Sequence, residues 1–469
     1  MLGTLYLLVS ATAALAASAP SNDRFNPSAY AADDIIERDF AIIGGGAAGT
    51  YAAISLADQN HTFTLIEITD RLGGNTRTFS DPSTGANVDF GVQFHLDTPV
   101  VREFFNRLNT ALAPVDIEYF GISEYYDFTN RIALANYTRG SFGPDYVAEL
   151  DRHPYTRDLA ELPHPVPEDL LLTWPEYAQS HNLSSGSTDG GFALPATPGE
   201  PLDTLALHTF NQGGHVLLAE FAGAAVHETT YNNSALYVNA LAELRQNVSL
   251  QSSIVAARRS ASRKSGVQLI ATTPAGRKLI RAKQLLIAMP PVLDNANPLG
   301  LDRREYDILS RLEGKHYYGG VVNNTGLEPN VAYTNAGVDR PYHVPHLPGV
   351  NELSPSATPG YHFYWYNSVE AQSQEEVERT VRRTIQWLQT QSNITDAPEP
   401  NFLDYEDYYP YRPVPSAEDI ADGWYGNMAG LQGHRNTWYI SSIFVAGSTQ
   451  VWNSTLNLLP EIIGAAAQG

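Results

Sequence analysis

Residues 39–67 read DFAIIGGGAAGTYAAISLADQNHTFTLIE, and this stretch decides the fold of the 469-residue chain. Residues 40–43 form a short apolar run, typical of a strand that is buried on both faces. The alanine-rich residues 47–59 favour a helix, and the β-branched pattern of residues 62–66 favours a second strand. The stretch therefore predicts a strand, a glycine turn, a helix and a parallel strand, which is the opening unit of an α/β sheet.

The glycine turn has the spacing G-x-G-x-x-G at Gly44, Gly46 and Gly49. In such a unit the first glycine permits the tight turn, the second lets the backbone approach a pyrophosphate, and the third lets the helix pack closely on the sheet. The first helical turn, around Ala48, offers free N–H groups to an anion. Glu67 follows Gly49 by 18 residues, where such units place a carboxylate that binds the adenosine ribose.

These features predict a dinucleotide site, against the alternative of a glycine-rich turn without a ligand. An acid at position 67 argues against the 2′-phosphate of NADP, so NAD and FAD remain.

Four further motifs distinguish between NAD and FAD. They are RLGGNT at residues 71–76, NVDFG at 87–91, LLIAMPP at 285–291 and IFVAG at 443–447. They resemble, in the same order, motifs of the FAD-dependent amine oxidase superfamily, and they cover roughly a third of the chain, all in the cofactor half. The pattern is most similar to the fungal beta-cyclopiazonate dehydrogenase family.

The resemblance implies a set of FAD-binding residues. In that family the Arg-x-Gly-Gly turn lies against the flavin and its diphosphate, and the backbone after the first strand of a β-meander lies over the adenine. Asn75 stands where many members carry an arginine. The residues assigned to FAD are Gly44, Gly46, Ala48, Gly49, Glu67, Arg71, Gly73, Gly74, Asn75, Ile254, Val255 and Gly447.

The same resemblance implies the domain organisation, an α/β fold with an α+β second domain. Residues 38–98, 240–292 and 434–469 would form a Rossmann-type FAD-binding domain with a β-meander. Residues 99–239 and 293–433 would form an inserted, aromatic-rich substrate domain. Within the cofactor half, residues 438–445 are expected to form a strand. The final helix is expected over residues 461–467, with Pro460 in its first turn and its N-terminus toward the flavin.

Three stretches of the substrate half carry specific expectations. In YHFYWY, residues 361–366, alternation places Tyr361, Phe363 and Trp365 on one face. Either one face packs in the core and the other lines a flat cavity, or the strand is central and buried on both faces. Residues 404–413 contain four tyrosines that either extend this wall or form a proline-limited loop. Residues 154–201 are rich in Pro, Gly and Ser and predict long surface loops or a lid.

The candidate catalytic residues are Lys315, His316 and Tyr317, because family members carry a lysine near flavin N5 on the corresponding strand. Lys315 follows its glycine at a shorter spacing than the lysine of the family pattern does. We expect these side chains to hold a water or orient a heteroatom of the substrate, rather than to act as a strong base. The alternative for each residue is a solvent-exposed position at the start of a strand, without a role in catalysis. Without cysteine, the flavin is bound either non-covalently, which is the expected case, or through a histidine, and His95 is the nearest candidate for such a link.

Composition narrows the chemistry and the partners. The sequence has no cysteine, which excludes disulfides, thiolate metal sites and a cysteinyl flavin; no metal site is expected. A net charge of −22 and a pI near 4.9 argue against nucleic acid and anionic membranes as partners.

The N-terminus and the sequons predict passage through the secretory pathway, to a secreted or lumenal location. Residues 1–19 are uncharged and rich in leucine and alanine, which favours a signal peptide over an uncleaved anchor. Asn453 is expected to be unmodified because of its closeness to the flavin. The sequon asparagines of this predicted glycoprotein are Asn60, Asn136, Asn182, Asn232, Asn247, Asn323, Asn393 and Asn453.

The expected function is that of an FAD-dependent oxidase or dehydrogenase. It would oxidise a small, largely apolar metabolite of natural-product biosynthesis by hydride transfer to the flavin, alone or coupled to ring closure, with O2 as the expected acceptor. The alternatives are a secreted amine or polyamine oxidase, and a flavoprotein fold that binds without turnover.

Overall fold

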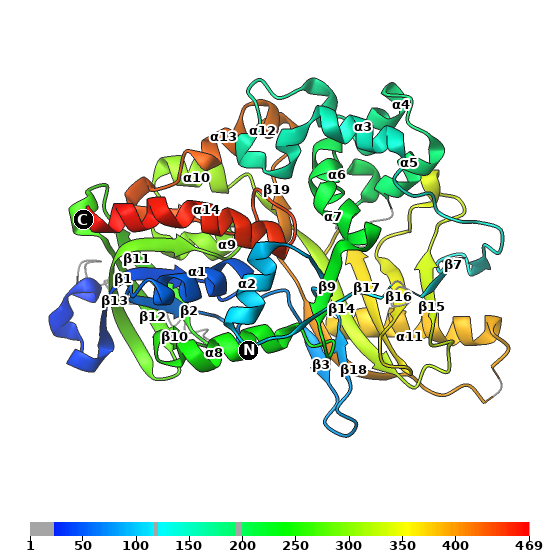
Figure 1. Ribbon diagram of the computed structural model, residues 1–469, viewed down its shortest axis with the longest axis horizontal. Coiled ribbons are helices and arrows are strands. Elements are labelled where there is room, and N and C mark those ends of the chain that lie inside the picture. The colour runs from blue at the N-terminus through cyan, green and yellow to red at the C-terminus, as the bar shows by residue number, and fades with distance from the viewer. Residues whose placement is uncertain (1–22, 117–120, 193–198, 395, 469) are drawn as a thin grey trace, which may run out of the picture.

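The computed structural model describes residues 23–116, 121–192, 199–394 and 396–468. Two sheets lie next to each other along the long axis, and a group of short helices covers the upper part of the second (Figure 1). The predicted signal peptide, residues 1–19, lies outside the described residues. None of the described helices combines the length and the apolar character that a membrane crossing requires.

The first sheet contains the predicted dinucleotide unit. Its strand order is β10-β2-β1-β13-β12-β11, with β20 beside β13. The strand β1 lies in the centre and pairs in parallel with β2 and β13, while β11, β12 and β13 form an antiparallel meander. The strands are β1 (Ile35–Ile43), β2 (Phe63–Ile66), β10 (Val248–Ser249), β11 (Ser253–Arg259), β12 (Val267–Thr273), β13 (Gly276–Ile287) and β20 (Thr437–Tyr439).

Helices from distant parts of the chain surround this sheet. The helix α1 follows the glycine turn and packs beside α14, the last helix of the chain (Figure 1). The helices are α1 (Ala47–Asp58), α2 (Pro99–Arg107), α8 (Ser234–Leu244), α9 (Leu293–Ala296), α10 (Arg303–Leu309) and α14 (Ser448–Ala467).

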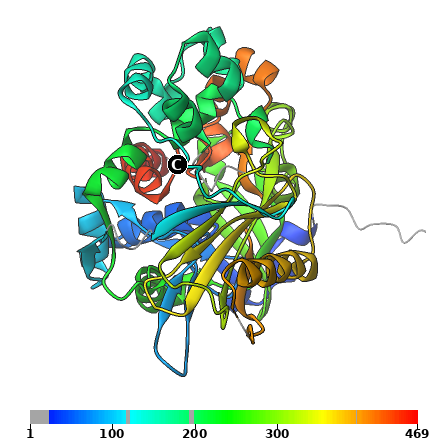
Figure 2. The ribbon, with the colours of Figure 1, turned by 90° about the vertical axis from the view of Figure 1, so that its right-hand side faces the viewer.

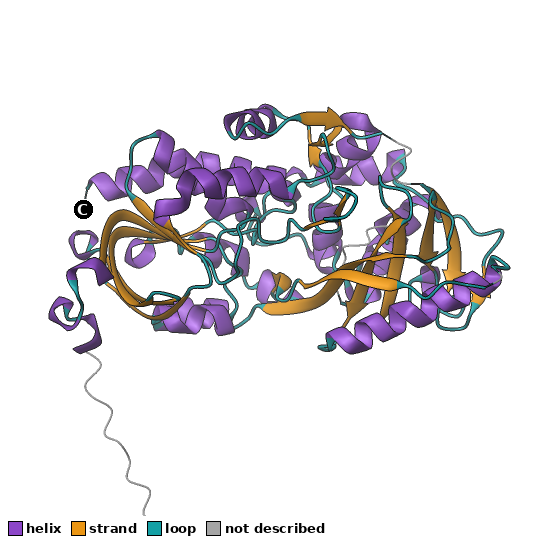
Figure 3. Cartoon of the chain, turned by 90° about the horizontal axis from the view of Figure 1, so that it is seen from below, coloured by secondary structure: helices purple, strands orange, loops and turns teal. Residues whose placement is uncertain are grey.

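The second sheet is mostly antiparallel, with the order β18-β14-β17-β16-β15-β7-β8 and β19 beside β14. The helix α11 (Gln374–Gln391) lies along its outer face (Figure 3). The strands are β7 (Ile122–Asp127), β8 (Ile132–Ala133), β14 (Glu313–Asn323), β15 (Val331–Asn335), β16 (Gly349–Pro355), β17 (Tyr361–Ser368), β18 (Asn401–Asp407) and β19 (Tyr411–Val414). The mixed α/β class with an antiparallel-rich second sheet is therefore confirmed.

The alternation in YHFYWY separates two environments. Tyr364 and Tyr366 pack with Val377 and other residues of α11 in the outer core. Phe363, on the other face, packs with Phe90 of the cofactor half. The second face of the sheet therefore points toward the first sheet.

Residues 154–201 differ from the prediction of long loops. Their described part is largely short helices (Figure 2), and Trp174 and Tyr177 are fully buried. The prolines explain the error, because proline is favoured in the first turn of a helix, and Pro154, Pro175 and Pro201 all occupy such positions. With their neighbours in the chain, these residues form the group of short helices above the second sheet (Figure 1). These helices are α3 (Pro144–Arg152), α4 (Trp174–Ser180), α5 (Ser185–Gly191), α6 (Ala206–Gln212) and α7 (His215–Ala219).

The predicted ends of the last strand and the predicted start of the last helix also need correction. The last strand, β20, ends at Tyr439, so residues 443–445 are not in a strand. The helix α14 begins at Ser448 and contains Pro460 in its interior. Leu459 and Ile462 on either side of this proline are buried. The remaining strands are β3 (Thr78–Ser80), β4 (Asn87–Asp89), β5 (His95–Leu96), β6 (Leu112–Pro114) and β9 (Ala225–Glu228), and α12 (Ala417–Ala421) and α13 (Trp424–Ala429) complete the helices named here.

Asn453 is exposed on α14. The expectation that closeness to the flavin keeps it unmodified stays a prediction. Glycosylation and secretion stay predictions. The exposed sequon asparagines are Asn60, Asn136, Asn182, Asn393 and Asn453.

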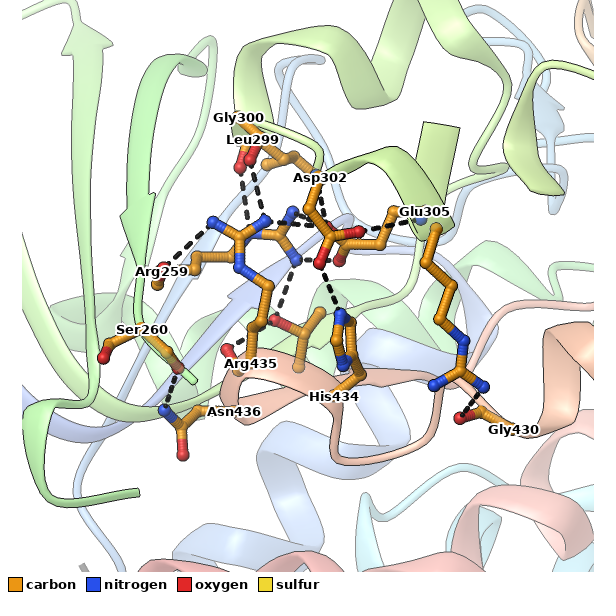
Figure 4. Close-up of polar contacts among 12 residues, drawn as sticks. Arg259, Ser260, Leu299, Gly300, Asp302, Glu305, Gly430, His434, Arg435 and Asn436 are labelled. Carbon is orange, nitrogen blue, oxygen red and sulfur yellow. Dashed lines mark hydrogen bonds and ion pairs between the residues drawn. The ribbon is translucent and has the colours of Figure 1, made fainter. Parts of the chain in front are cut away.

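A buried ion-pair network joins three segments in and around the first sheet (Figure 4). Arg259 of β11 binds Glu305 of α10 through two contacts of 2.5 and 2.8 Å, and both side chains are fully buried. Arg435, in the turn before β20, donates to the same carboxylate at 2.8 Å. Because each charge has a close partner, the network can be buried without an isolated charge.

We expect Glu305→Gln to lower the free energy of unfolding by about 3 kcal/mol, because it leaves Arg259 buried beside a neutral amide. Denaturant unfolding measures the change. The matched control is Asp307→Asn on the same helix, which breaks only an exposed pair with Arg303 and should cost less than about 1 kcal/mol. Equal losses in the two variants would contradict the importance of the buried pair.

Burial of His362 makes the free energy of unfolding depend on pH, and it determines the direction of that dependence. Burial lowers the pKa of His362 from 6.5 to about 4. Between these values the unfolded chain binds a proton that the folded protein does not bind, so the contribution to stability is complete above pH 6.5 and is lost as the pH falls toward 4. One such group changes the free energy of unfolding by up to about 1.4 kcal/mol per pH unit.

We expect His362→Gln to flatten the loss of stability over this range, measured by denaturant unfolding at several pH values. His215→Gln, at an exposed position of α7, is the control and should follow the wild type. An unchanged pH profile in His362→Gln would show that this histidine is not responsible.

Candidate cofactor and substrate site

The glycine turn after β1 leaves the start of α1 open to an anion. Gly44 has φ +101°, a conformation that glycine adopts without strain. Gly46 is the N-cap of α1, and no described side chain caps the helix there. Ala48, in the first turn, is buried against the core. The N–H groups of this 12-residue helix are therefore available to a diphosphate.

The RLGGNT turn lies directly against the glycine turn. A Cβ atom on Gly74 would lie only 2.9 Å from the Cα of Gly46, so position 74 has no room for a larger residue. Gly73 donates its N–H to the carbonyl of Gly45 at 2.8 Å. Arg71 donates to the carbonyls of Gly74 and Thr76 at 2.8 and 2.9 Å. Arg71 thus fixes the shape of its own turn.

Glu67 connects the glycine turn to the end of β2. Its Oε2 accepts from the N–H of Gly45 at 2.6 Å, and its Oε1 accepts from the N–H and the hydroxyl of Thr69, each at 2.8 Å. The side chain is buried. A carboxylate has about four acceptor positions, so Glu67 keeps capacity for a ribose hydroxyl.

The two meander residues assigned to the adenine lie beside this carboxylate. Ser252, one residue before β11, donates its N–H to the carbonyl of Glu67 at 2.9 Å. Ile254 points into the core, whereas Val255 is 45% exposed. The pairing of β11 with β12 shifts between Ile254 and Ala256, so Val255 lies in a bulge of the edge strand. Its backbone groups are therefore free of that ladder.

These features fit the ADP part of FAD. A helix start without a cap, two glycine turns in contact and a buried acid form one continuous surface. Gly44, Gly46 and the first turn of α1 would hold the diphosphate, Gly49 lets the helix pack closely, and Glu67 would hold the ribose.

The two halves of the protein meet at the carbonyl of Phe90, in the NVDFG motif. This oxygen accepts from the hydroxyl of Tyr408 at 3.2 Å and from Nε1 of Trp365 at 3.3 Å. Two residues later, Val92 donates its N–H to the carbonyl of Asn75 at 3.3 Å. The end of the RLGGNT turn and the second sheet are thus linked through residues 90–92.

Tyr317 lies at this junction, in a group of rings that we call the aromatic wall: Tyr317, Trp365, Tyr408 and Tyr411. Its ring stacks on Tyr411 with centroids 4.8 Å apart, and Tyr408 is 5.7 Å away. Burial raises the pKa of Tyr317 well above its usual range, with smaller contributions from Tyr411, Tyr408 and Glu352. Its hydroxyl is buried and has no hydrogen-bond partner in the described part of the chain. Such a group points to a ligand or water at this position.

The strand β14 separates the three candidate catalytic residues. Lys315 and Tyr317 are two residues apart and share one face, whereas His316 points to the other. There it stacks on Tyr409, with centroids 4.5 Å apart. Lys315 is partly exposed, with Nζ 3.6 Å from Glu313. We therefore remove His316 from the candidates, because strand alternation turns it away from the site.

The start of α14 forms another side of the cofactor region. Gly447 precedes this helix with φ +79°, and the hydroxyl of Ser448 lies 2.7 Å from Nδ1 of His95. The His95 ring is buried between Trp452 and Phe105, and burial lowers its pKa to about 3. Packing and the contact with Ser448 thus account for His95 without a bond to the flavin.

Sequence reasoning missed several contributors to this site. Trp365, Tyr408 and Tyr411 lie in the expected aromatic stretches, but nothing in the sequence shows that their strands meet Phe90. Glu352 has no sequence signal, because it stands alone in a strand with no motif.

A comparison with protein-family models matches residues 42–108 to an NAD(P)-binding Rossmann-like domain. The FAD-dependent oxidoreductase dbaF of Emericella nidulans is 46% identical over 454 residues, which are 97% of each chain. The beta-cyclopiazonate dehydrogenase of Aspergillus oryzae is 28% identical over 92% of this chain and 94% of its own.

Solved structures support the fold alone. The CLA-producing fatty acid isomerase from P. acnes has a TM-score of 0.69 and 17% identity over 90% of this chain and 98% of that one. The cyclohexylamine oxidase from Brevibacterium oxydans has a TM-score of 0.63 and 16% identity over 92% and 99%. By fold, motifs and full-length similarity, the chain belongs to the fungal FAD-dependent oxidoreductases related to dbaF and beta-cyclopiazonate dehydrogenase, with the amine oxidase-like fold.

Proposed function

We propose that this enzyme oxidises a small, flat and largely apolar metabolite of natural-product biosynthesis. The observation that carries the proposal is the aromatic wall beside residues 90–92, with the buried hydroxyl of Tyr317 left without a partner among the described residues. When bound, FAD would supply a two-electron acceptor for a hydride, with O2 as the proposed final acceptor. The similarity to beta-cyclopiazonate dehydrogenase supports a role in such a pathway.

The residues of the chain position the reactants. The first turn of α1 and Glu67 hold the ADP part of the cofactor, and the rings of Trp365 and Tyr408 limit the substrate to a flat shape. Positioning alone can supply about 7–11 kcal/mol of barrier lowering, so hydride removal here does not require a strong base. Tyr317 orients a heteroatom of the substrate, and Lys315 lies at the exposed end of the same face.

The alternative of an amine or polyamine oxidase has support from the shared fold only. The similarity to cyclohexylamine oxidase is at 16% identity. Whether ring closure follows oxidation depends on the substrate. A panel of hydroxylated aromatic compounds and cyclic amines, tested without oxygen for bleaching of the flavin, separates the two functions.

We expect Glu67→Ala to weaken FAD binding by about 1.5–3 kcal/mol, because it removes a charged hydrogen-bond acceptor. Titration of the folded apoprotein with FAD measures this, and thermal unfolding reports the loss of the contacts with Gly45 and Thr69. The control is Glu37→Ala, at an exposed position of the same sheet, which should keep wild-type affinity. Wild-type FAD affinity in Glu67→Ala would count against the assignment.

We expect Tyr317→Phe to fold normally, because the hydroxyl makes no hydrogen bond within the described protein, and to slow flavin reduction by up to about 100-fold. Anaerobic stopped-flow absorbance, with a compound from the panel, measures the rate. Lys315→Met should slow flavin reduction by no more than the same factor, and His316→Phe should reduce the flavin at the wild-type rate. A loss of about 10⁴-fold from one substitution, with FAD content unchanged, would show that the enzyme depends on a dedicated acid–base residue.

A further inference from the structure

Glu352 stands on the same face of the second sheet as Tyr317. In the pairing of β16 with β17, Glu352 is opposite Trp365, and in the pairing of β17 with β14, Trp365 is opposite Gly319. Directly paired residues share a face, and so do residues two apart on a strand, which adds Tyr317. Leu353, next to Glu352, points the other way into the core under α11.

The polar surroundings of Glu352 hold its carboxylate in place. The hydroxyl of Thr334 donates to Oε2 at 3.1 Å, and the hydroxyl of Ser354 donates to Oε1. Burial raises the pKa of Glu352, and the two hydroxyls and the charge of Arg139 act in the opposite direction. The residue as a whole is half-buried, so part of its surface stays accessible.

Glu352 differs from the other acids on this face. Asp404 and Glu406 are opposite Val321 and Gly319, and both form ion pairs with Arg77. Glu352 forms no ion pair within the described residues. Two neighbouring hydroxyls take up only two of its roughly four acceptor positions. A carboxylate that is fixed but not neutralised in an aromatic wall leaves acceptor capacity for a ligand.

We propose that Glu352 determines substrate specificity by accepting a hydrogen bond from a hydroxyl group of a flat aromatic substrate. The proposal rests on the proposed function, since it concerns the same site. Acceptance from a hydroxyl follows from the geometry, because Thr334 and Ser354 already act as donors and an ionised carboxylate can only accept.

The neighbouring charge distinguishes a hydroxyl from an ammonium group. Arg139 donates to the carbonyls of Asn335 and His343, which holds its guanidinium on this side of the sheet. Its positive charge acts on Glu352 and offsets part of the attraction between the carboxylate and a cationic substrate. A neutral phenolic or alcoholic hydroxyl does not meet this opposing charge effect.

The test uses three probes on the FAD-loaded protein: naphthol, its methyl ether and naphthylmethylamine. Affinity is measured by the perturbation of the flavin absorbance spectrum. We expect the wild type to bind naphthol about tenfold or more tightly than the methyl ether, because only naphthol can donate to the carboxylate. Naphthylmethylamine, a cation at neutral pH, should bind more weakly than naphthol.

Glu352→Gln keeps the size of the side chain and removes its charge. We expect it to lose most of the preference for naphthol, while its affinity for the methyl ether stays within about twofold of the wild type. The matched control is Glu124→Gln on β7 of the same sheet, whose position is opposite Tyr333 and so lies on the other face. It should keep the full preference.

Three results would overturn the proposal: no preference for naphthol in the wild type, a preserved preference in Glu352→Gln, or tighter binding of the amine than of naphthol. The wild-type comparison decides even if Glu352→Gln does not fold. A protein that binds FAD and is reduced by a compound from the panel, but shows no preference, refutes the role of Glu352 alone. A flavin that no compound reduces would refute the proposed function itself.

Discussion

The hydrogen bond between the carboxylate of Glu67 and the N–H of Gly45 is the contact on which the cofactor site depends. It ties the end of β2 to the turn after β1, at 2.6 Å. The carbonyl of Gly45 then receives the N–H of Gly73, and this brings Gly74 against Gly46. One buried acid therefore sets the relative position of both glycine turns, so it has an architectural role beside the ribose contact predicted for it.

Long-range contacts complete the half of the molecule that holds these turns. The strand β1 reaches its register by pairing with β13, more than 200 residues later in the chain. The Arg259–Glu305 pair then attaches the meander to α10 and to the segment before β20. Because this network is buried and fully paired, it fixes the orientation of chain segments that apolar packing alone would leave less defined.

The substrate side is built differently. Its aromatic wall comes from β14, β17 and the residues after β18, and it touches the cofactor half through the carbonyl of Phe90. Few polar groups lie on this face. Asp404 and Glu406 form ion pairs with arginine, and two hydroxyls donate hydrogen bonds to Glu352. The hydroxyl of Tyr317 has no hydrogen-bond partner among the described residues. Under the proposed function, recognition there would depend on shape and on a small number of hydrogen bonds.

The sequence by itself determined the first sheet, the cofactor and the family, because each motif is a continuous stretch whose function needs only its own residues. Gly44, Gly46, Gly49 and Glu67 lie within one βαβ unit. It failed where local signals were ambiguous: prolines in residues 154–201 start helices rather than loops, and Pro460 lies inside α14. Only the tertiary structure decided which side chains form the substrate face. Alternation excludes His316 from it, and strand pairing brings in Glu352, because a residue's face depends on partners that lie far away in the sequence.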